Sequence, residues 1–237
     1  GSPLGDERST LTQTDLDDII GAFADAAAAA EQAGFDGVEL HGAHGYLIDQ
    51  FLWSQTNRRT DGYGGDPVAR TRFAAEIVAA VRKTVAPTFP VVFRMSQWKS
   101  GAYDAKLAAD PQELERILTP LVEAGVDVLH ASTRRYWQPE FDGSDLNFAG
   151  WVKKITGLPA ITVGSVGLDK EFISTFQGQS PSVTGIEQLL ERLGRDEFDL
   201  VAVGRALIAD PAWAEKVRTG RAAEIIPFDL PALRTLH

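Results

Sequence analysis

Gly34-Phe35-Asp36-Gly37-Val38-Glu39-Leu40-His41 marks the passage from a helix to a strand that ends in a polar side chain. In residues 15–33 before it, apolar side chains recur at spacings of three and four, which predicts an amphipathic helix that Gly34 terminates. Thr14 is the expected N-cap of this helix. The apolar run that follows is short and leads into a glycine-rich turn, which predicts a buried strand that feeds a functional loop.

The same order of helix and strand recurs four more times along the chain. The expected helices cover residues 67–85, 111–124, 148–156 and 185–193, and the expected strands cover residues 89–94, 126–130, 159–164 and 200–204. Asp110 precedes the helix at 111–124 as its N-cap. Short apolar strands separated by helices are typical of a parallel sheet covered on both faces. We therefore predict an α/β fold of the TIM (β/α)8-barrel type, with about five βα units in this chain.

Length and composition predict one domain. The chain has 237 residues, of which 44% are hydrophobic and 24% charged, and this balance is typical of a globular domain. We expect residues 1–237 to form a single (β/α)-barrel domain that is N-terminally incomplete, because five strands do not close a barrel of eight. Gly1-Ser2-Pro3 has the composition of a tag-cleavage remnant. Residues 170–184 are expected to be a loop insertion between the last two units.

Charge and cysteine content exclude several classes of function. The net charge of −10 opposes binding to a phosphate backbone, so nucleic acid is not an expected partner. The longest uncharged stretch, residues 172–186, is polar, so no membrane span is expected. The chain has no cysteine, which excludes thiolate metal sites and thiol nucleophiles and fits a reducing compartment, so we expect a cytoplasmic location.

The loop after the first strand carries the most chemistry. His41 and His44 are three positions apart on a turn, and together they can hold one oxygen atom beside the phenol of Tyr46, a proton donor. On the residues alone, the two histidines could equally be weak metal ligands or hydrogen-bonded core groups. No metal site is predicted, since no third ligand has a clear spacing.

Further candidates follow the other strands. Arg94 ends the second strand and would place a positive charge at the barrel rim, where one possible role is an ion pair with a carboxylate of a neighbouring strand. Tyr136, after the third strand, would either line a substrate pocket or cap the barrel. Glycine-rich loops follow the last two strands, where barrels commonly bind phosphate. Their candidate residues are Gly164, Ser165, Gly204 and Arg205.

With the loop at 57–65 and the segment Arg70-Thr71-Arg72-Phe73, these motifs resemble the Old Yellow Enzyme family of FMN-dependent NAD(P)H oxidoreductases. The resemblance extends from the helix before His41 to Asp210-Pro211. It implies that His41 and His44 bind a carbonyl or nitro oxygen of the substrate and that Tyr46 donates the proton. It also favours the flavin as the partner of Arg94 and the FMN phosphate as the ligand of the two glycine-rich loops.

The implied function is that of an oxidoreductase in which NADH or NADPH reduces FMN and the flavin then reduces an activated C=C bond of the enone type. A dienoyl thioester or a nitro compound is a further possible acceptor. The alternative is a truncated half-barrel, inactive alone, that needs an N-terminal segment to bind FMN. Exposed sheet edges drive association, so we expect either a homo-oligomer or association with the missing N-terminal segment.

Overall fold

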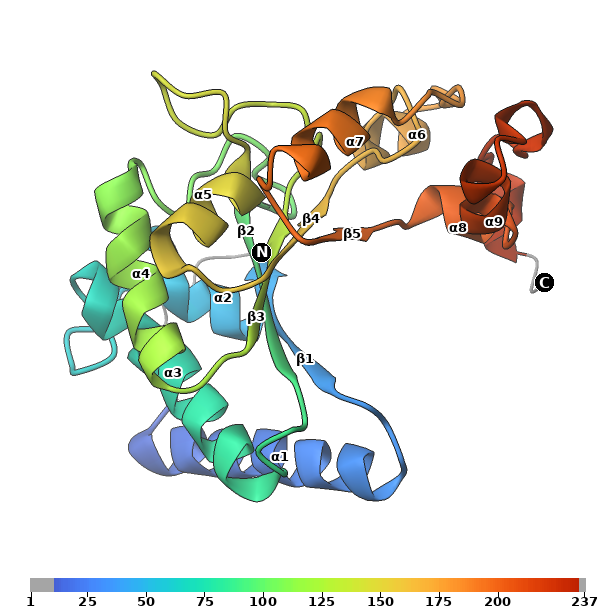
Figure 1. The fold of residues 1–237 in the computed structure, drawn as a ribbon. Coiled ribbons are helices and arrows are strands. Elements are labelled where there is room, and N and C mark those ends of the chain that lie inside the picture. The colour runs from blue at the N-terminus through green and yellow to red at the C-terminus, as the bar shows by residue number, and fades with distance from the viewer. Residues whose placement is uncertain (1–10, 235–237) are drawn as a thin grey trace.

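The computed structural model describes residues 11–234, so the expected tag remnant lies outside the described residues. Its centre is a sheet of five parallel strands in the order β1-β2-β3-β4-β5 (Figure 1). The strands are β1 (Val38–His44), β2 (Val91–Lys99), β3 (Val128–Ser132), β4 (Ala160–Val163) and β5 (Leu200–Ala202). Neighbours in sequence are neighbours in the sheet, as expected for five successive units of a barrel.

The connecting helices pack along one face of this sheet. The long ones are α1 (Gln13–Gln32), α3 (Pro67–Thr84), α4 (Pro111–Glu123) and α5 (Phe148–Thr156), and each packs against the next (Figure 1). α7 (Glu187–Gly194) precedes β5. The shorter elements are α2 (Leu47–Leu52), α6 (Phe172–Phe176), α8 (Arg205–Ala209), α9 (Trp213–Arg218) and the 3-10 turns Ala222–Glu224 and Leu230–Arg234.

The two faces of the sheet differ in burial. Side chains that face the helices, such as Leu40, Phe93 and Leu129, are at most 5% exposed and form the core with α3 and α4. The opposite, inner face is only partly covered, and Leu200 on β5 is 53% exposed. The expectation that helices cover both faces is therefore wrong for the described residues. Helices cover one face, and the other is the inner face of a partial barrel.

Register aligns the polar residues of the inner face in one row. His41 on β1 pairs with Arg94 on β2, and Arg94 pairs with His130 on β3. Because paired residues of a parallel sheet point to the same side, these three side chains share the inner face near the carboxyl ends of the strands. The sheet thus gathers imidazole and guanidinium groups at the end where barrels carry their active sites.

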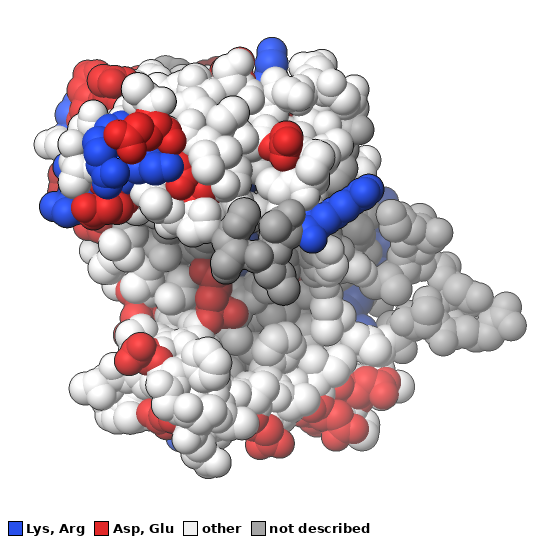
Figure 2. All heavy atoms as spheres, turned by 90° about the vertical axis from the view of Figure 1, so that its right-hand side faces the viewer, with Lys and Arg blue, Asp and Glu red and all other residues white. Residues whose placement is uncertain are grey.

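Local signals explain where the helices begin. The N-cap of α1 is Thr12 and not Thr14: the Thr12 side chain accepts from the backbone N–H of Asp15, whose carboxylate accepts from the N–H of Thr12. Asp110 caps α4, as the sequence predicts. The segment 170–184 is not all loop, since it contains the short helix α6, capped by Glu171. Figure 2 shows the face turned by 90° from Figure 1, where acidic and basic side chains mix at the upper left and acidic side chains predominate in the lower half.

Candidate active site

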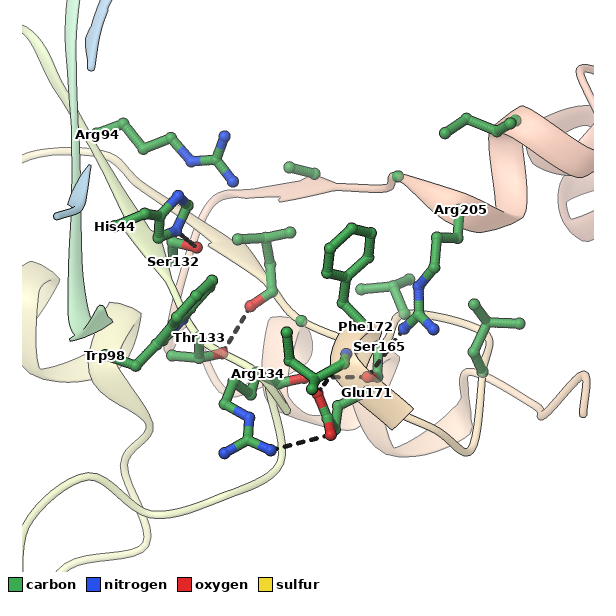
Figure 3. A pocket seen from close by; sticks show the side chains of 18 residues that line it. His44, Arg94, Trp98, Ser132, Thr133, Arg134, Ser165, Glu171, Phe172 and Arg205 are labelled. Carbon is green, nitrogen blue, oxygen red and sulfur yellow. Dashed lines mark hydrogen bonds and ion pairs between the residues drawn. The ribbon is translucent and has the colours of Figure 1, made fainter. Parts of the chain in front are cut away.

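A cavity of about 330 Å³, which we name the main cavity, lies at the carboxyl ends of the strands (Figure 3). Six of the predicted site residues line it together: His44, Arg94, Gly164, Ser165, Gly204 and Arg205. His41, Tyr46 and Tyr136 are not among its lining residues. The cavity thus extends from Arg94 on β2 to the glycine-rich loops that follow β4 and β5.

Residues 41–46, the clamp turn, bring the first three candidates together. The ring of His41 has its centroid 5.3 Å from that of His44 and 5.3 Å from that of Tyr46. The turn needs left-handed backbone at two positions, His44 with φ 63° and Gly45 with φ 84°. Tyr46 is 62% exposed, so its hydroxyl is accessible to a ligand beside the two imidazoles.

Side chains from two elements hold the backbone of this turn. The N–H of His44 donates to Ser96 Oγ over 2.9 Å, and the N–H of Gly45 donates to Asp49 Oδ2 over 2.6 Å. The carbonyl of Gly45 accepts from Gln50 Nε2 over 2.8 Å. A non-glycine residue in the left-handed region is strained, and these hydrogen bonds compensate for that strain.

A buried ion pair supports the clamp turn from below. Lys99 Nζ lies 2.6 Å from Asp49 Oδ1 and donates to the carbonyl of Ser96 over 2.9 Å. The two side chains are 1% and 0% exposed. Burial raises the pKa of Asp49, while Lys99 and the N–H of Gly45 act against that rise. Lys99 thus connects β2 to α2 through the carboxylate that holds Gly45.

Both clamp histidines are neutral at neutral pH. Burial, with the positive charge of Arg94 next, lowers the pKa of His44 to about 3 and also lowers the pKa of His41. The His44 ring stacks on Trp98 with centroids 4.3 Å apart, and its Nε2 lies 2.9 Å from Ser132 Oγ. A neutral imidazole offers one N–H and one lone pair, so the two histidines can donate hydrogen bonds to an oxygen.

Within residues 11–234, no group of three His, Cys, Asp or Glu side chains could hold a metal.

Arg94 is a cation without an ion-pair partner in the described part of the chain. Its Nε is buried and lacks a hydrogen-bond partner, and its guanidinium faces the main cavity (Figure 3). Burial lowers the pKa of Arg94, and the charge of Glu39 acts in the opposite direction. Glu39 instead lies 2.7 Å from His130 Nδ1. The interpretation of Arg94 as half of a structural ion pair is not supported.

The opposite end of the main cavity combines open backbone with a buried cation. A Cβ at Gly204 would meet nothing within 4 Å, so the backbone there is open to a ligand. Arg205 is 8% exposed, and its guanidinium donates to Thr175 Oγ1 over 2.8 Å and to the carbonyl of Lys170 over 2.7 Å. The segment 170–184 therefore holds the side chain that the sequence assigns to a phosphate.

Sequence reasoning missed a second ion pair beside the cavity. Arg134 lies 2.9 Å from Glu171, the residue that caps α6 (Figure 3). Burial acts to raise the pKa of Glu171, but hydrogen bonds from Arg134, Ser174 and Ile173 outweigh it and lower this pKa to about 2. The position of Arg134, two residues after β3, could have indicated that it lies near the cavity. Nothing in the hydrophobic pattern indicates its partner Glu171, which lies 37 residues away in the insertion.

Tyr136 is placed away from the site. Its side chain is 4% exposed and belongs to the core, with its ring edge-on to that of Trp137 at 5.1 Å. Its backbone N–H donates to the carbonyl of Gly164 over 3.1 Å. The structure supports a role in fixing the loop after β3 and does not support Tyr136 as a substrate contact, because the ring turns into the core.

Residues 4–224 match the NADH:flavin oxidoreductase / NADH oxidase family. The chain belongs to this family. The resemblance stated from the motifs is thereby confirmed, and with it FMN as the cofactor and NADH or NADPH as the reductant of the family. No helix within residues 11–234 is long and apolar enough to cross a membrane.

Known relatives extend beyond this chain. An NADH oxidase of Thermoanaerobacter brockii is 39% identical over an alignment of 232 residues that covers 94% of this chain and 32% of that protein. An NADPH dehydrogenase of Bacillus pumilus is 36% identical and covers 92% of this chain and 60% of that protein. The solved structure of morphinone reductase in complex with tetrahydroNAD superposes with a TM-score of 0.73 and 26% identity, over 94% of this chain and 53% of that chain. The chain therefore spans between about a third and three fifths of the length of these relatives. The expected α/β fold of the barrel type, with five βα units, is confirmed.

The residues of the main cavity fit FMN. The phosphate would lie at the open backbone of Gly204 and beside Arg205, which keeps further N–H groups after its bonds to the insertion. The flavin ring would meet the unpartnered Nε side of Arg94 at the other end. A cation there stabilises negative charge on a reduced ring.

Proposed function

We propose that this chain forms the FMN-binding and substrate-binding part of an oxidoreductase that uses NADH or NADPH to reduce an activated C=C bond, as in an enone. The main cavity is the observation that carries the proposal. It joins an unpartnered cation, Arg94, and a neutral histidine, His44, to a buried Arg205 beside open glycine backbone. FMN, when bound, supplies the hydride-transfer chemistry.

The clamp turn orients and polarises the substrate. The neutral imidazoles of His41 and His44 donate hydrogen bonds to the carbonyl oxygen of the acceptor, where negative charge develops as the β-carbon is reduced. Because both rings have lowered pKa values, they act as hydrogen-bond donors and not as acids. Tyr46, with its ring 5.3 Å from that of His41, donates the proton to the α-carbon.

The partly open inner face supports a second proposal, about what the chain requires in order to bind FMN with full affinity. Leu200 on the edge strand β5 is 53% exposed, and the chain covers 53% of morphinone reductase. We propose that full FMN affinity requires an N-terminal segment that completes the barrel, or self-association that covers these edges. The single-domain reading of residues 1–237 and the cytoplasmic location stay predictions.

Spectroscopy tests both proposals. The chain is titrated with FMN alone, then with an N-terminal barrel fragment added, and flavin binding is followed by fluorescence quenching. NADPH or NADH and a neutral enone such as 2-cyclohexenone are then added without oxygen. Reduction of the flavin by the nicotinamide and its reoxidation by the enone support the proposed activity. Flavin binding that needs the fragment supports the incomplete barrel, and a flavin that the enone never reoxidises contradicts ene-reduction.

A further inference from the structure

A second cavity of about 440 Å³ adjoins the main one. It is lined by the end of β2 and the loop that follows it, from Gln97 to Lys106, and by the end of β3 and its following loop, from Ser132 to Glu140. The two cavities share Trp98, Ser132, Thr133 and Arg134 as lining residues. A molecule held at the clamp turn can therefore extend past Trp98 into the second cavity.

Ring contacts lead from the clamp turn to this cavity. Trp98 stacks on His44 at 4.3 Å, and its other neighbour is Tyr103, at 5.9 Å between centroids. The guanidinium of Arg134 lies 5.2 Å from the centroid of the Tyr103 ring. The surface between the oxygen clamp and the second cavity is thus aromatic and ends in a cation.

The cavity holds one cation more than its internal pairs require. Lys106 is paired with Glu140, and Arg134 with Glu171. Arg135, which also lines the cavity and is half-buried, forms no side-chain hydrogen bond or ion pair within residues 11–234. Asp104, which also lines the cavity, is exposed and forms no ion pair with Arg135 in the described structure.

The backbone around Arg135 is fixed. The N–H of Thr133 donates to the carbonyl of Val163 over 3.3 Å, and the N–H of Tyr136 donates to the carbonyl of Gly164 over 3.1 Å. The hydroxyl of Ser165 donates to the carbonyl of Arg134 over 3.0 Å. Since the loop is tied to the strand end β4 on both sides of Arg135, its guanidinium is presented from a rigid support, as a binding site requires.

We propose that the second cavity is an anion subsite in which Arg135 pairs with a carboxylate or phosphate of a molecule whose reacting end lies at His41 and His44. This inference rests on the proposed function. A planar guanidinium without an internal partner matches both anions, which it can bind through two parallel N–H groups. Two sources fit this chemistry: a carboxylate on the alkene acceptor, or a phosphate of the nicotinamide reductant.

The test compares matched neutral and anionic ligands. Calorimetry measures the binding of phenol and of 4-hydroxybenzoate to the FMN-loaded protein, to Arg135→Gln, to Arg135→Lys and to the control Arg116→Gln. Arg116 is an exposed arginine of α4 whose partner is Asp66, and it lines neither cavity. We expect Arg135→Gln to weaken 4-hydroxybenzoate about tenfold with phenol unchanged, Arg135→Lys to restore part of the loss, and the control to bind both as the parent does.

A kinetic arm separates the two sources of the anion. If the KM for NADPH rises in Arg135→Gln while the KM for NADH stays constant, the 2′-phosphate of NADPH occupies the subsite; if both KM values rise, the diphosphate common to both reductants does. If only the binding of anionic acceptors and of 4-hydroxybenzoate is weakened, the carboxylate of the acceptor occupies the subsite. Unchanged binding and KM for every ligand, or equal weakening of phenol and 4-hydroxybenzoate, overturns the subsite. If the parent protein binds neither phenol nor 4-hydroxybenzoate, the oxygen clamp is overturned instead. Failure of the anion subsite and failure of the proposed function are therefore distinguishable.

Discussion

The two ends of the main cavity are built in opposite ways. At the clamp turn, side chains of α2 and β2 hold the backbone, and the ring of His44 lines the cavity. At the glycine-rich end, the backbone of Gly204 is open and the functional side chain, Arg205, is held by the insertion 170–184. The first end is therefore sensitive to the loss of buried support, and the second to the loss of a distant loop.

The largest expected effect is at the support of the clamp turn. Asp49→Asn removes one charge of a pair that is 0% and 1% exposed and leaves Lys99 buried without its counter-charge. We expect a loss of about 3–5 kcal/mol in the free energy of unfolding, measured by urea denaturation. We also expect weaker phenol binding, because the N–H of Gly45 loses a charged acceptor.

The matched control for this variant is Glu215→Gln, which makes the same change from carboxylate to amide in the exposed pair with Arg218. Its stability should stay close to that of the parent, because exposed ion pairs contribute little. If Asp49→Asn were as stable as the control, the buried pair would not support the turn.

The next effect concerns the clamp itself. His44→Ala or His41→Ala should weaken the binding of a phenolate by roughly 1.5–3 kcal/mol each, the contribution of a hydrogen bond to a charged group. Tyr46→Phe is the informative comparison, because it should preserve binding and slow only the protonation step. Ligand titrations followed by calorimetry measure the first effect, and turnover with 2-cyclohexenone the second. Full affinity in both histidine variants would exclude the oxygen clamp.

A smaller effect is expected at the glycine-rich end. Arg205→Ala should lower FMN affinity about tenfold, or 1.4 kcal/mol, because part of its guanidinium already serves Lys170 and Thr175. Fluorescence titration with FMN measures this effect. Thr175→Val keeps the cation and removes one of its anchors, so its loss should be smaller. Equal losses in the two variants would mean that Arg205 acts only by holding the insertion.

The same contrast explains what the sequence could predict. Periodicity and the polar residues after each strand locate the five units and bring Arg94, Gly164 and Arg205 to one rim, because strand ends of a parallel sheet meet at one edge. The clamp turn was predictable because its three side chains are local in sequence.

Contacts between distant residues were not predictable. Lys99 and Asp49 are 50 positions apart, and Arg134 meets Glu171 only because the insertion lies against the loop after β3. Tyr136 follows a strand as the other candidates do, yet its ring packs into the core. The position of a residue after a strand gives its approximate place, but the direction of its side chain depends on tertiary packing. The N-cap of α1 is likewise Thr12 and not the expected Thr14, because the end of a helix also depends on the local hydrogen bonds that form there.

The smallest expected effect separates the two ends by pH. His44 has its pKa lowered from 6.5 to about 3, so the unfolded chain binds more protons than the folded one between these values. The stability that this group contributes is complete above pH 6.5 and is lost as the pH falls towards 3. Glu171, with its pKa lowered from 4.5 to about 2, contributes stability that is complete above pH 4.5 and is lost below it.

Acidification should therefore weaken the clamp end first and the glycine-rich end second. Solvent screens the partly exposed His44 ring, so its effect on stability is smaller than the pKa difference alone would give. We expect the parent to lose about 1 kcal/mol more than His44→Gln between pH 6.5 and pH 4.5. Below pH 4.5 the parent should also lose stability faster than Glu171→Gln. Over the same range, each further pH unit should add less to the stability difference between the parent and His44→Gln. Urea denaturation at intervals of half a pH unit measures both windows. Parallel curves for the parent and His44→Gln above pH 4.5 would mean that His44 is not held neutral by burial, and the description of the clamp as a pair of neutral donors would then be wrong.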